Sequence, residues 1–416
     1  MGKNVVIIGG GIIGLCSAYF LEKEGNKVTI LDKSNMLSGA SYVNAGYITP
    51  SHIVPLASPG MISKGLRYMF DSSSPFYMKP RFDLDFIKWA WYFKRSSTKS
   101  KVEKAIPIIK DINILSRELF EGIKSSGDLG DFHLERKGLL MLYQNQEAGD
   151  EEMKIAKKAK FMGLKVKRLD GNGVNKLEPN IKINAVGGVH YECDGHTTPN
   201  EFMEKMISYL LTTGVTIHKN EEVIDIHSSN QKIRSVETTK RTLNADEVIF
   251  AAGSWTSDLS KKLKVNLPMQ AGKGYSIDVK TNTNISMPAI LMEAKVAVTP
   301  MMGFTRFAGT MEFSGINTTI RRERVNAIAN SASKFYENLH IPKMDREDAK
   351  CGLRPVTPDG LPYIGKSSKY KNLIFATGHA MMGWSLGPIT GKLVAQISSN
   401  KKTEMNITSF SPDRKF

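Results

Sequence analysis

Residues 5–14, VVIIGGGIIG, constrain the fold of this chain more than any other stretch. The apolar residues at its start predict a buried strand. Gly9, Gly11 and Gly14 then stand in G-x-G-x-x-G order, and a helical pattern continues to Leu21. A strand that ends in such a glycine turn and leads into a helix is typical of the first half of a dinucleotide-binding β–α–β unit.

The residues that follow complete this unit. A second apolar strand, 27–31, ends at Asp32, which is followed by Lys33. An acid about 20 residues after the glycine turn is placed to accept from a ribose hydroxyl, while the helix that opens with Ile12 and Ile13 offers free N–H groups to a pyrophosphate. We therefore predict a dinucleotide cofactor at this turn.

Length and composition limit the remaining choices. The chain has 416 residues, which favours two domains, and 41% hydrophobic with 24% charged residues is ordinary for a globular protein. The three cysteines are far apart, which indicates a reducing compartment. We find neither a signal-peptide cleavage site nor a run of roughly 18 apolar residues, so we expect a cytoplasmic protein without a transmembrane helix.

The net charge of +16 would suit a polyanionic partner, but the lysines are scattered over helical faces such as 154–168. Residues 82–95 combine aromatic with basic side chains. Such a helix could lie at a membrane interface, or it could bury its aromatic residues in the core. We favour the core interpretation, and peripheral contact with the inner face of the plasma membrane stays open as the alternative.

Two further strands place small residues at their carboxyl ends, 246–253 and 372–379, and the loop 38–46 is also rich in small residues. Open α/β sheets bind ligands at that edge. The cofactor domain is therefore predicted to be discontinuous. The expected division is 1–46, 166–259 and 346–416 for the cofactor domain, and 47–165 and 260–345 for a substrate domain.

Other patterns predict helices at 103–125, 147–163 and 199–212 and a strand at 139–143. Thr198 and Glu201 have the spacing of a capping box before the third helix. The segment 190–196 contains two histidines and a cysteine, but its spacing fits no structural zinc pattern and a fourth ligand is missing, so we predict no metal.

Near the C-terminus, 352–365 reads GLRPVTPDGLPYIG, and 377–391 adds T-G-H, G-W and G-P. With the N-terminal motif, these segments resemble the FAD-dependent amine and amino-acid oxidoreductases typified by D-amino acid oxidase and glycine oxidase, over nearly the whole chain. The resemblance implies an α/β (α+β) two-domain fold, with a Rossmann-like FAD-binding domain and a discontinuous substrate domain of β-sheet plus helices.

Within that family, 41–46, 57–60 and 273–276 look most like the bacterial D-amino acid dehydrogenases of the small-subunit type. The resemblance implies FAD and oxidation of D-amino acids to imino acids by hydride transfer from Cα to flavin N5. It also implies that the electrons pass to a quinone or another member of the respiratory chain.

The resemblance also assigns site residues. Arg354 would grip the substrate carboxylate, and Tyr275 is a candidate helper; Arg306 is a weaker candidate that reads better as an exposed strand residue. Met381 and Met382 stand where glycine oxidase carries an arginine, which suggests an apolar pocket wall. The expected cofactor-binding residues are Gly9, Gly11, Ile12, Ile13, Gly14, Asp32, Lys33, Ala40, Ser41, Asn44, Ala45, Gly46, Val223, Ala252, Gly253, Gly378, His379, Gly383, Trp384, Ser385 and Leu386.

Two other functions remain open at this stage. A secondary amine such as D-proline, hydroxyproline or sarcosine could replace the D-amino acid, because pocket shape decides the substrate. Some tRNA-modifying flavoproteins share this fold, and the chain is basic. The sequence has no RNA-binding module, however, which argues against nucleic acid.

Overall fold

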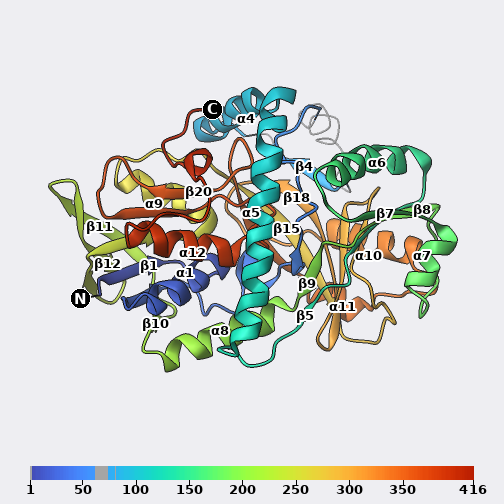
Figure 1. Cartoon of the computed structure of the whole chain (residues 1–416), viewed down its shortest axis with the longest axis horizontal. Coiled ribbons are helices and arrows are strands. Elements are labelled where there is room, and N and C mark those ends of the chain that lie inside the picture. The colour runs from blue at the N-terminus through green and yellow to red at the C-terminus, as the bar shows by residue number, and fades with distance from the viewer. Residues whose placement is uncertain (1, 61–73, 80) are drawn as a thin grey trace.

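The computed structural model describes residues 2–60, 74–79 and 81–416, arranged around two large β-sheets that lie side by side (Figure 1). The predicted strand, glycine turn and helix at the N-terminus are confirmed. Strand β1 is buried from its second residue onward, and helix α1 begins directly after Gly11. Their bounds are β1 Asn4–Ile8, α1 Ile12–Lys23 and β2 Lys27–Leu31.

The first sheet has the strand order β10-β2-β1-β14-β21-β20, and every pair is parallel except β20 with β21. Its strands come from both ends and the middle of the chain. Helices α1 and α12 pack together in its core, joined by α8 and by the long helix α5 that crosses Figure 1. The further bounds are β10 Thr216–His218, β14 Glu247–Phe250, β20 Tyr363–Lys366, β21 Leu373–Thr377, α5 Lys99–Ser126, α8 Pro199–Thr212 and α12 Gly387–Ser398.

The second sheet has nine strands in the order β19-β15-β18-β17-β16-β6-β8-β7, with β4 paired to β18. Helix α10 packs against β18, and α6 and α7 cover β8. The bounds are β4 Phe76–Met78, β6 Leu139–Tyr143, β7 Val166–Asp170, β8 Gly187–Tyr191, β15 Gln270–Val279, β16 Ala289–Leu291, β17 Val296–Met301, β18 Phe304–Phe313, β19 Lys350–Val356, α6 Gln146–Phe161, α7 Gly171–Leu177, α10 Arg322–Phe335 and α11 Lys343–Glu347.

Sheet pairing suggests where one domain passes into the other. Strands β7 and β8 pair with one another and with β6, and β19 pairs with β15. We therefore propose that 166–191 and 350–356 belong with the substrate domain, whereas the sequence had placed them with the cofactor domain. The alternation of apolar and polar residues can predict a short strand, but it does not show which sheet the strand joins. That choice depends on pairing partners that are distant in sequence.

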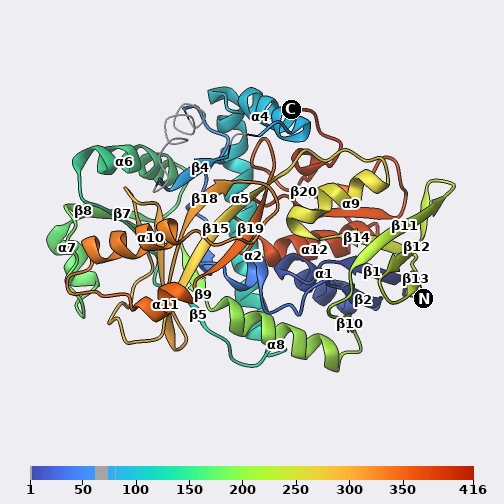
Figure 2. The same cartoon turned by 180° about the vertical axis from the view of Figure 1, so that it is seen from behind.

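Two three-stranded sheets and several short helices, among them α9 Thr256–Lys262, lie outside the two large sheets. A three-stranded sheet is formed by β11 Val223–Ser229, β12 Lys232–Thr238 and β13 Thr242–Asn244, and another by β3 Tyr47–Ile48, β9 Gly195–Thr197 and β5 Leu134–Glu135. Seen from behind, α2, Gly39–Tyr42, lies where the two halves meet, beside β19 (Figure 2). The aromatic helix α4, Leu84–Ser96, lies near the C-terminus (Figure 1).

Candidate active site

A cavity of about 430 Å³ opens at the carboxyl ends of the parallel strands. Its wall includes the residues after β1, β2, β14 and β21, the helix α2, and Leu353 to Pro355 of β19. A volume of this size is usual for a small-molecule or cofactor site. The topology thus brings together segments from residue 8 to residue 384.

The glycine turn has the geometry that a phosphate-binding turn needs. Gly9 has φ +110°, and a Cβ there would lie 2.5 Å from the carbonyl oxygen of Ala251. A Cβ on Gly14 would lie 1.9 Å from the carbonyl oxygen of Gly9, so the helix can approach the strand only without a side chain. Both positions therefore require glycine, and the N-terminus of α1 faces the cavity.

Asp32 closes the glycine turn from the second strand. Its carboxylate accepts from the N–H of Gly10 at 2.7 Å and from the N–H of Ser34 at 2.8 Å. The Ile12 N–H at the start of α1 donates to the Ser41 hydroxyl at 3.0 Å. These bonds hold the turn, the acid and α2 in one arrangement, which we propose to be ready for the ribose and pyrophosphate of the cofactor.

The structure brings most of the predicted cofactor residues to this cavity. Those that line it are Gly9, Gly11, Ile12, Ile13, Asp32, Lys33, Ala40, Ser41, Asn44, Val223, Ala252, Gly253, His379, Gly383 and Trp384. Those that do not line it are Gly14, Ala45, Gly46, Gly378, Ser385 and Leu386. Gly14 and Gly46 instead sit against neighbouring backbone, where a Cβ would lie 1.9 and 2.2 Å from a carbonyl oxygen.

Several lining residues carried no recognisable sequence signal. Met36 reaches the glycine turn, with its terminal methyl 2.5 Å from a Cβ built on Gly10. The Lys33 ammonium lies 3.9 Å from the centre of the Trp255 ring, and both residues line the cavity. Trp255 directly follows the small residues after β14, so its place near that strand end was the one available clue.

Arg354 lies on β19 at the wall of the cavity. Its Nη1 donates to the carbonyl oxygen of Thr310 at 2.8 Å, and Thr310 holds the unusual φ of +72° within β18. The guanidinium covers Gly274, where a Cβ would clash with it at 2.3 Å. Among the described residues no carboxylate forms an ion pair with it, and burial lowers the pKa of Arg354 to about 10.

Tyr275 lies apart from this cavity wall. Its hydroxyl donates to Glu312 at 2.7 Å in a buried group that also contains Lys273 and Arg324. Burial, followed by the hydrogen bond to Glu312 and its negative charge, raises the pKa of Tyr275. A direct role in carboxylate binding is therefore not supported by its placement, although it belongs to the strand that carries Gly274.

The expectation that Arg306 is an exposed strand residue is wrong. Its side chain is fully buried and pairs with Asp278 at 2.6 Å. It also donates to the carbonyl oxygens of Tyr42 and Asn44, at 3.0 and 2.8 Å. Arg306 thus ties the small-residue loop beside the cavity to β18, a contact between segments that are remote in sequence.

The loop after β21 contains His379, Met381 and Met382, and only the histidine lines the cavity. His379 lines the cavity and shares a hydrogen bond with Thr390 at 2.9 Å, and burial lowers its pKa to about 3, in agreement with a packing role. Met382 belongs to the core beside α5, and Met381 is exposed. Neither methionine lines the cavity, so the expected apolar wall is made at Ala380 instead.

This fold and site define a class of flavoenzyme. Residues 4–397 match the model of the FAD-dependent oxidoreductase family named DAO, and the chain belongs to that family. Its cofactor is FAD, and the glycine turn and Asp32 suit the dinucleotide part of that molecule.

Individual relatives of this chain have more specific names than the family. The chain is 30% identical to a D-amino acid dehydrogenase of Helicobacter pylori, over 98% of this chain and 97% of that protein. It is 28% identical to a D-amino acid dehydrogenase of Neisseria gonorrhoeae, over 99% of both. Among solved structures, it is similar in fold to glycine oxidase from Geobacillus kaustophilus, with a TM-score of 0.78, 22% identity, and 100% and 99% of the two chains covered.

Proposed function

We propose that this flavoenzyme oxidises D-amino acids to imino acids, which then hydrolyse to 2-oxo acids and ammonia. Bound FAD supplies the chemistry by accepting a hydride from the substrate Cα at N5. The chain supplies orientation, which can be worth about 7–11 kcal/mol of barrier when the reacting groups are well placed. The names of the relatives support the D-amino acid as substrate.

The observation that carries the proposal is the guanidinium of Arg354. It lines the cofactor cavity, burial lowers its pKa, and no described carboxylate pairs with it. A half-buried guanidinium that lacks a carboxylate partner is costly, and its shape suits a planar carboxylate with two parallel hydrogen bonds. A substrate that brings its own carboxylate would satisfy this group. Thr310 already fixes one nitrogen of the guanidinium, which sets its plane.

The test is anaerobic mixing of the FAD-loaded protein with single amino acids while the visible flavin band is followed. D-Alanine should bleach the band, and Arg354→Met should weaken the response with FAD still bound. Because the substrate amine must be neutral to release hydride, bleaching should quicken as pH rises towards the pKa of that amine. Bleaching by proline-like or N-methylated substrates alone would identify a secondary-amine enzyme. No bleaching by any amino acid would refute the proposal.

We further infer that the electrons leave to a quinone at a membrane surface reached through α4. One side of α4 is buried, where Trp89 donates to the carbonyl oxygen of Val356 at 2.9 Å, close to Arg354. The other side exposes Leu84, which is 85% accessible, and Trp91, which is 53% accessible. The buried side agrees with the core interpretation of this helix, and the exposed side is the one that a membrane contact would use.

The exposed side also carries positive charge. The Arg95 guanidinium lies 4.7 Å from the centre of the Trp91 ring, and the Lys88 ammonium lies 5.9 Å from that of Tyr92. Exposed aromatic and aliphatic side chains with cations beside them suit the headgroup region of an anionic membrane. No helix in the described part of the chain is both long and apolar enough to cross a bilayer. The proposed contact is accordingly peripheral.

Sedimentation with vesicles that contain phosphatidylglycerol tests this contact. Ile87 is exposed beside Trp91 on α4. The protein should bind, and the double variant Ile87→Ser, Trp91→Ser should bind at least about 10-fold more weakly, because each buried apolar side chain is worth about 1.5–3 kcal/mol. Phe161→Ser is the matched control, since Phe161 is an exposed apolar residue of α6. Equal binding by the double variant and the control would refute the role of α4. Re-oxidation of reduced enzyme that is faster in air than with a quinone would refute the acceptor.

A further inference from the structure

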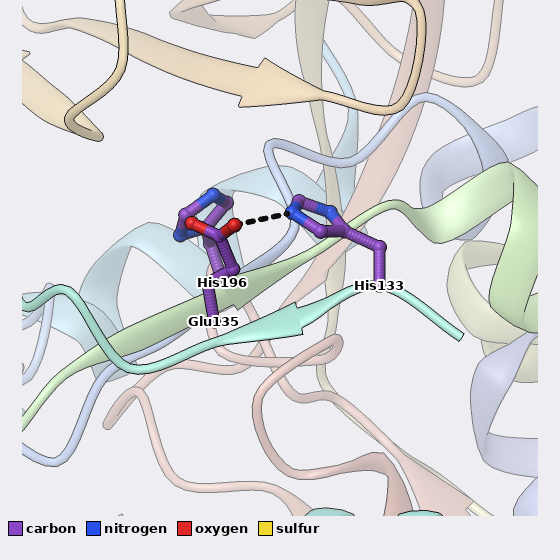
Figure 3. A group of neighbouring side chains, drawn as sticks. All are labelled: His133, Glu135 and His196. Carbon is purple, nitrogen blue, oxygen red and sulfur yellow. Dashed lines mark ion pairs between the residues drawn. The ribbon is translucent and has the colours of Figure 1, made fainter. Parts of the chain in front are cut away.

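Three potential metal ligands converge on the small sheet β3-β9-β5, outside the cofactor cavity (Figure 3). His133 directly precedes β5 and Glu135 ends it, and in extended backbone residues two apart point to the same side. Glu135 is paired directly with His196 of β9 in antiparallel register. The short pattern His-x-Glu thus meets a histidine that lies about sixty residues further along the chain.

The ligand atoms are close to the spacing that a metal ion needs. Nε2 of His133 lies 3.7 Å from Oε1 of Glu135, and one ligand atom from each of the three residues lies within 4.8 Å of the others. Ligands about 2.0–2.2 Å from a tetrahedral zinc ion are roughly 3.4 Å from one another. Small side-chain rotations would therefore bring all three onto one ion.

His196 gives the independent indication of a missing ligand. Its side chain is fully buried, yet among the described residues no side chain bonds to either ring nitrogen, and the backbone of Pro300 offers only a weak hydrogen bond. Buried polar groups without a partner are rare because they lose their hydration without compensation.

The surrounding contacts orient the other two ligands. Nδ1 of His133 lies 2.8 Å from the hydroxyl oxygen of Thr198, and a proton on that nitrogen leaves the Nε2 lone pair free. The predicted capping box is therefore wrong: the Thr198 side chain does not cap α8, and Glu201 accepts from the N–H of His133. Glu135 pairs with Lys137 through Oε2, at 2.6 Å, which leaves Oε1 towards His133.

We propose that His133, Glu135 and His196 form a binding site for a zinc ion that links β5 to β9. Two histidines and one carboxylate are a common zinc ligand set, and the partly exposed Glu135 leaves an approach from solvent for the ion and a water. The ion would steady Thr197, whose hydroxyl accepts from the Trp384 indole at 2.8 Å beside the cofactor cavity. The spacing within 190–196 predicted no metal, and the proposed site differs from it by drawing two of its ligands from residues 133–135.

The experiment uses untagged, FAD-loaded protein that has been dialysed against a chelator and then titrated with zinc chloride. Calorimetry and elemental analysis after gel filtration should give one zinc ion per chain at this site. His196→Ala should remove that ion while the FAD spectrum reports an intact fold. Should this variant fail to fold, Glu135→Gln serves as the second one. The affinity of Glu135→Gln for zinc should fall at least about 10-fold. Loss of even a residue that only hydrogen-bonds to a metal ligand costs about 10–100-fold in metal affinity.

A second histidine–carboxylate group supplies the matched control. Asp225, His227 and Glu237 also lie within metal-binding distance of one another, but Asp225 and His227 are exposed and His227 already pairs with Glu237 at 2.8 Å. His227→Ala should keep the zinc ion of the β5–β9 site. The proposal is overturned if wild-type protein retains no zinc, or if His196→Ala and Glu135→Gln bind it as tightly as wild type while His227→Ala does not.

Discussion

Gly274 forms the surface against which the Arg354 guanidinium rests, and a single methyl group there tests whether the position of that guanidinium governs the reaction. A Cβ at residue 274 would lie 2.3 and 2.4 Å from the two terminal nitrogens of Arg354 and 2.5 Å from Cζ. Ordinary contact between heavy atoms is about 3.5 Å or more, so the guanidinium must move by roughly 1 Å. The clash involves only the far end of a long side chain, so we expect Gly274→Ala to fold and to bind FAD.

A displacement of about 1 Å in a positioning group can cost about 100-fold in rate, or about 2.7 kcal/mol of transition-state stabilisation. We therefore expect kcat/KM for D-alanine to fall by about that factor, measured as anaerobic flavin reduction against substrate concentration. Gly122→Ala is the matched control, because nothing lies within 4 Å of a Cβ at that position of α5. If Gly274→Ala retains kcat/KM within about threefold of the control, the assignment of carboxylate binding to Arg354 is refuted.

Three further predictions concern buried charges. Arg306→Met should lower the free energy of unfolding by about 3–5 kcal/mol, because it leaves Asp278 without its partner, and it should loosen FAD; unchanged chemical denaturation would contradict this. For Glu312, burial raises the pKa, but hydrogen bonds and a nearby lysine outweigh it and the pKa is lowered. The stability that Glu312 provides is thus present above its unfolded pKa and lost as pH falls through the lower folded value, so Glu312→Gln should be destabilised at pH 7 and converge with wild type in acid; a deficit independent of pH would contradict this. Burial raises the pKa of Asp194 from 3.8 to about 7, so wild type should lose on the order of 4 kcal/mol as pH rises from 4 to 7, and Asp194→Asn should show no such loss when denaturation is compared across that range.

Local patterns determined the elements that this protein builds. The strand, glycine turn and helix at 4–23 follow from apolar runs and from positions that tolerate no side chain, and the strand 139–143 and the helix 199–212 have the bounds that the sequence predicted. The same logic placed most of the cofactor residues, because small residues at the carboxyl ends of parallel strands must meet at one edge of the sheet. The Arg-Pro signature placed Arg354 by resemblance, and the cavity wall includes it.

Pairing between distant segments decided what local patterns could not express. Arg306 reads as a strand residue, and only the packing of β18 against the loop 38–46 buries it beneath two carbonyl oxygens. His196 reads as part of a poor zinc motif until β5 brings His133 and Glu135 beside it. Sequence spacing constrains residues on the same strand or helix, whereas contacts across strands depend on register, which the whole fold sets.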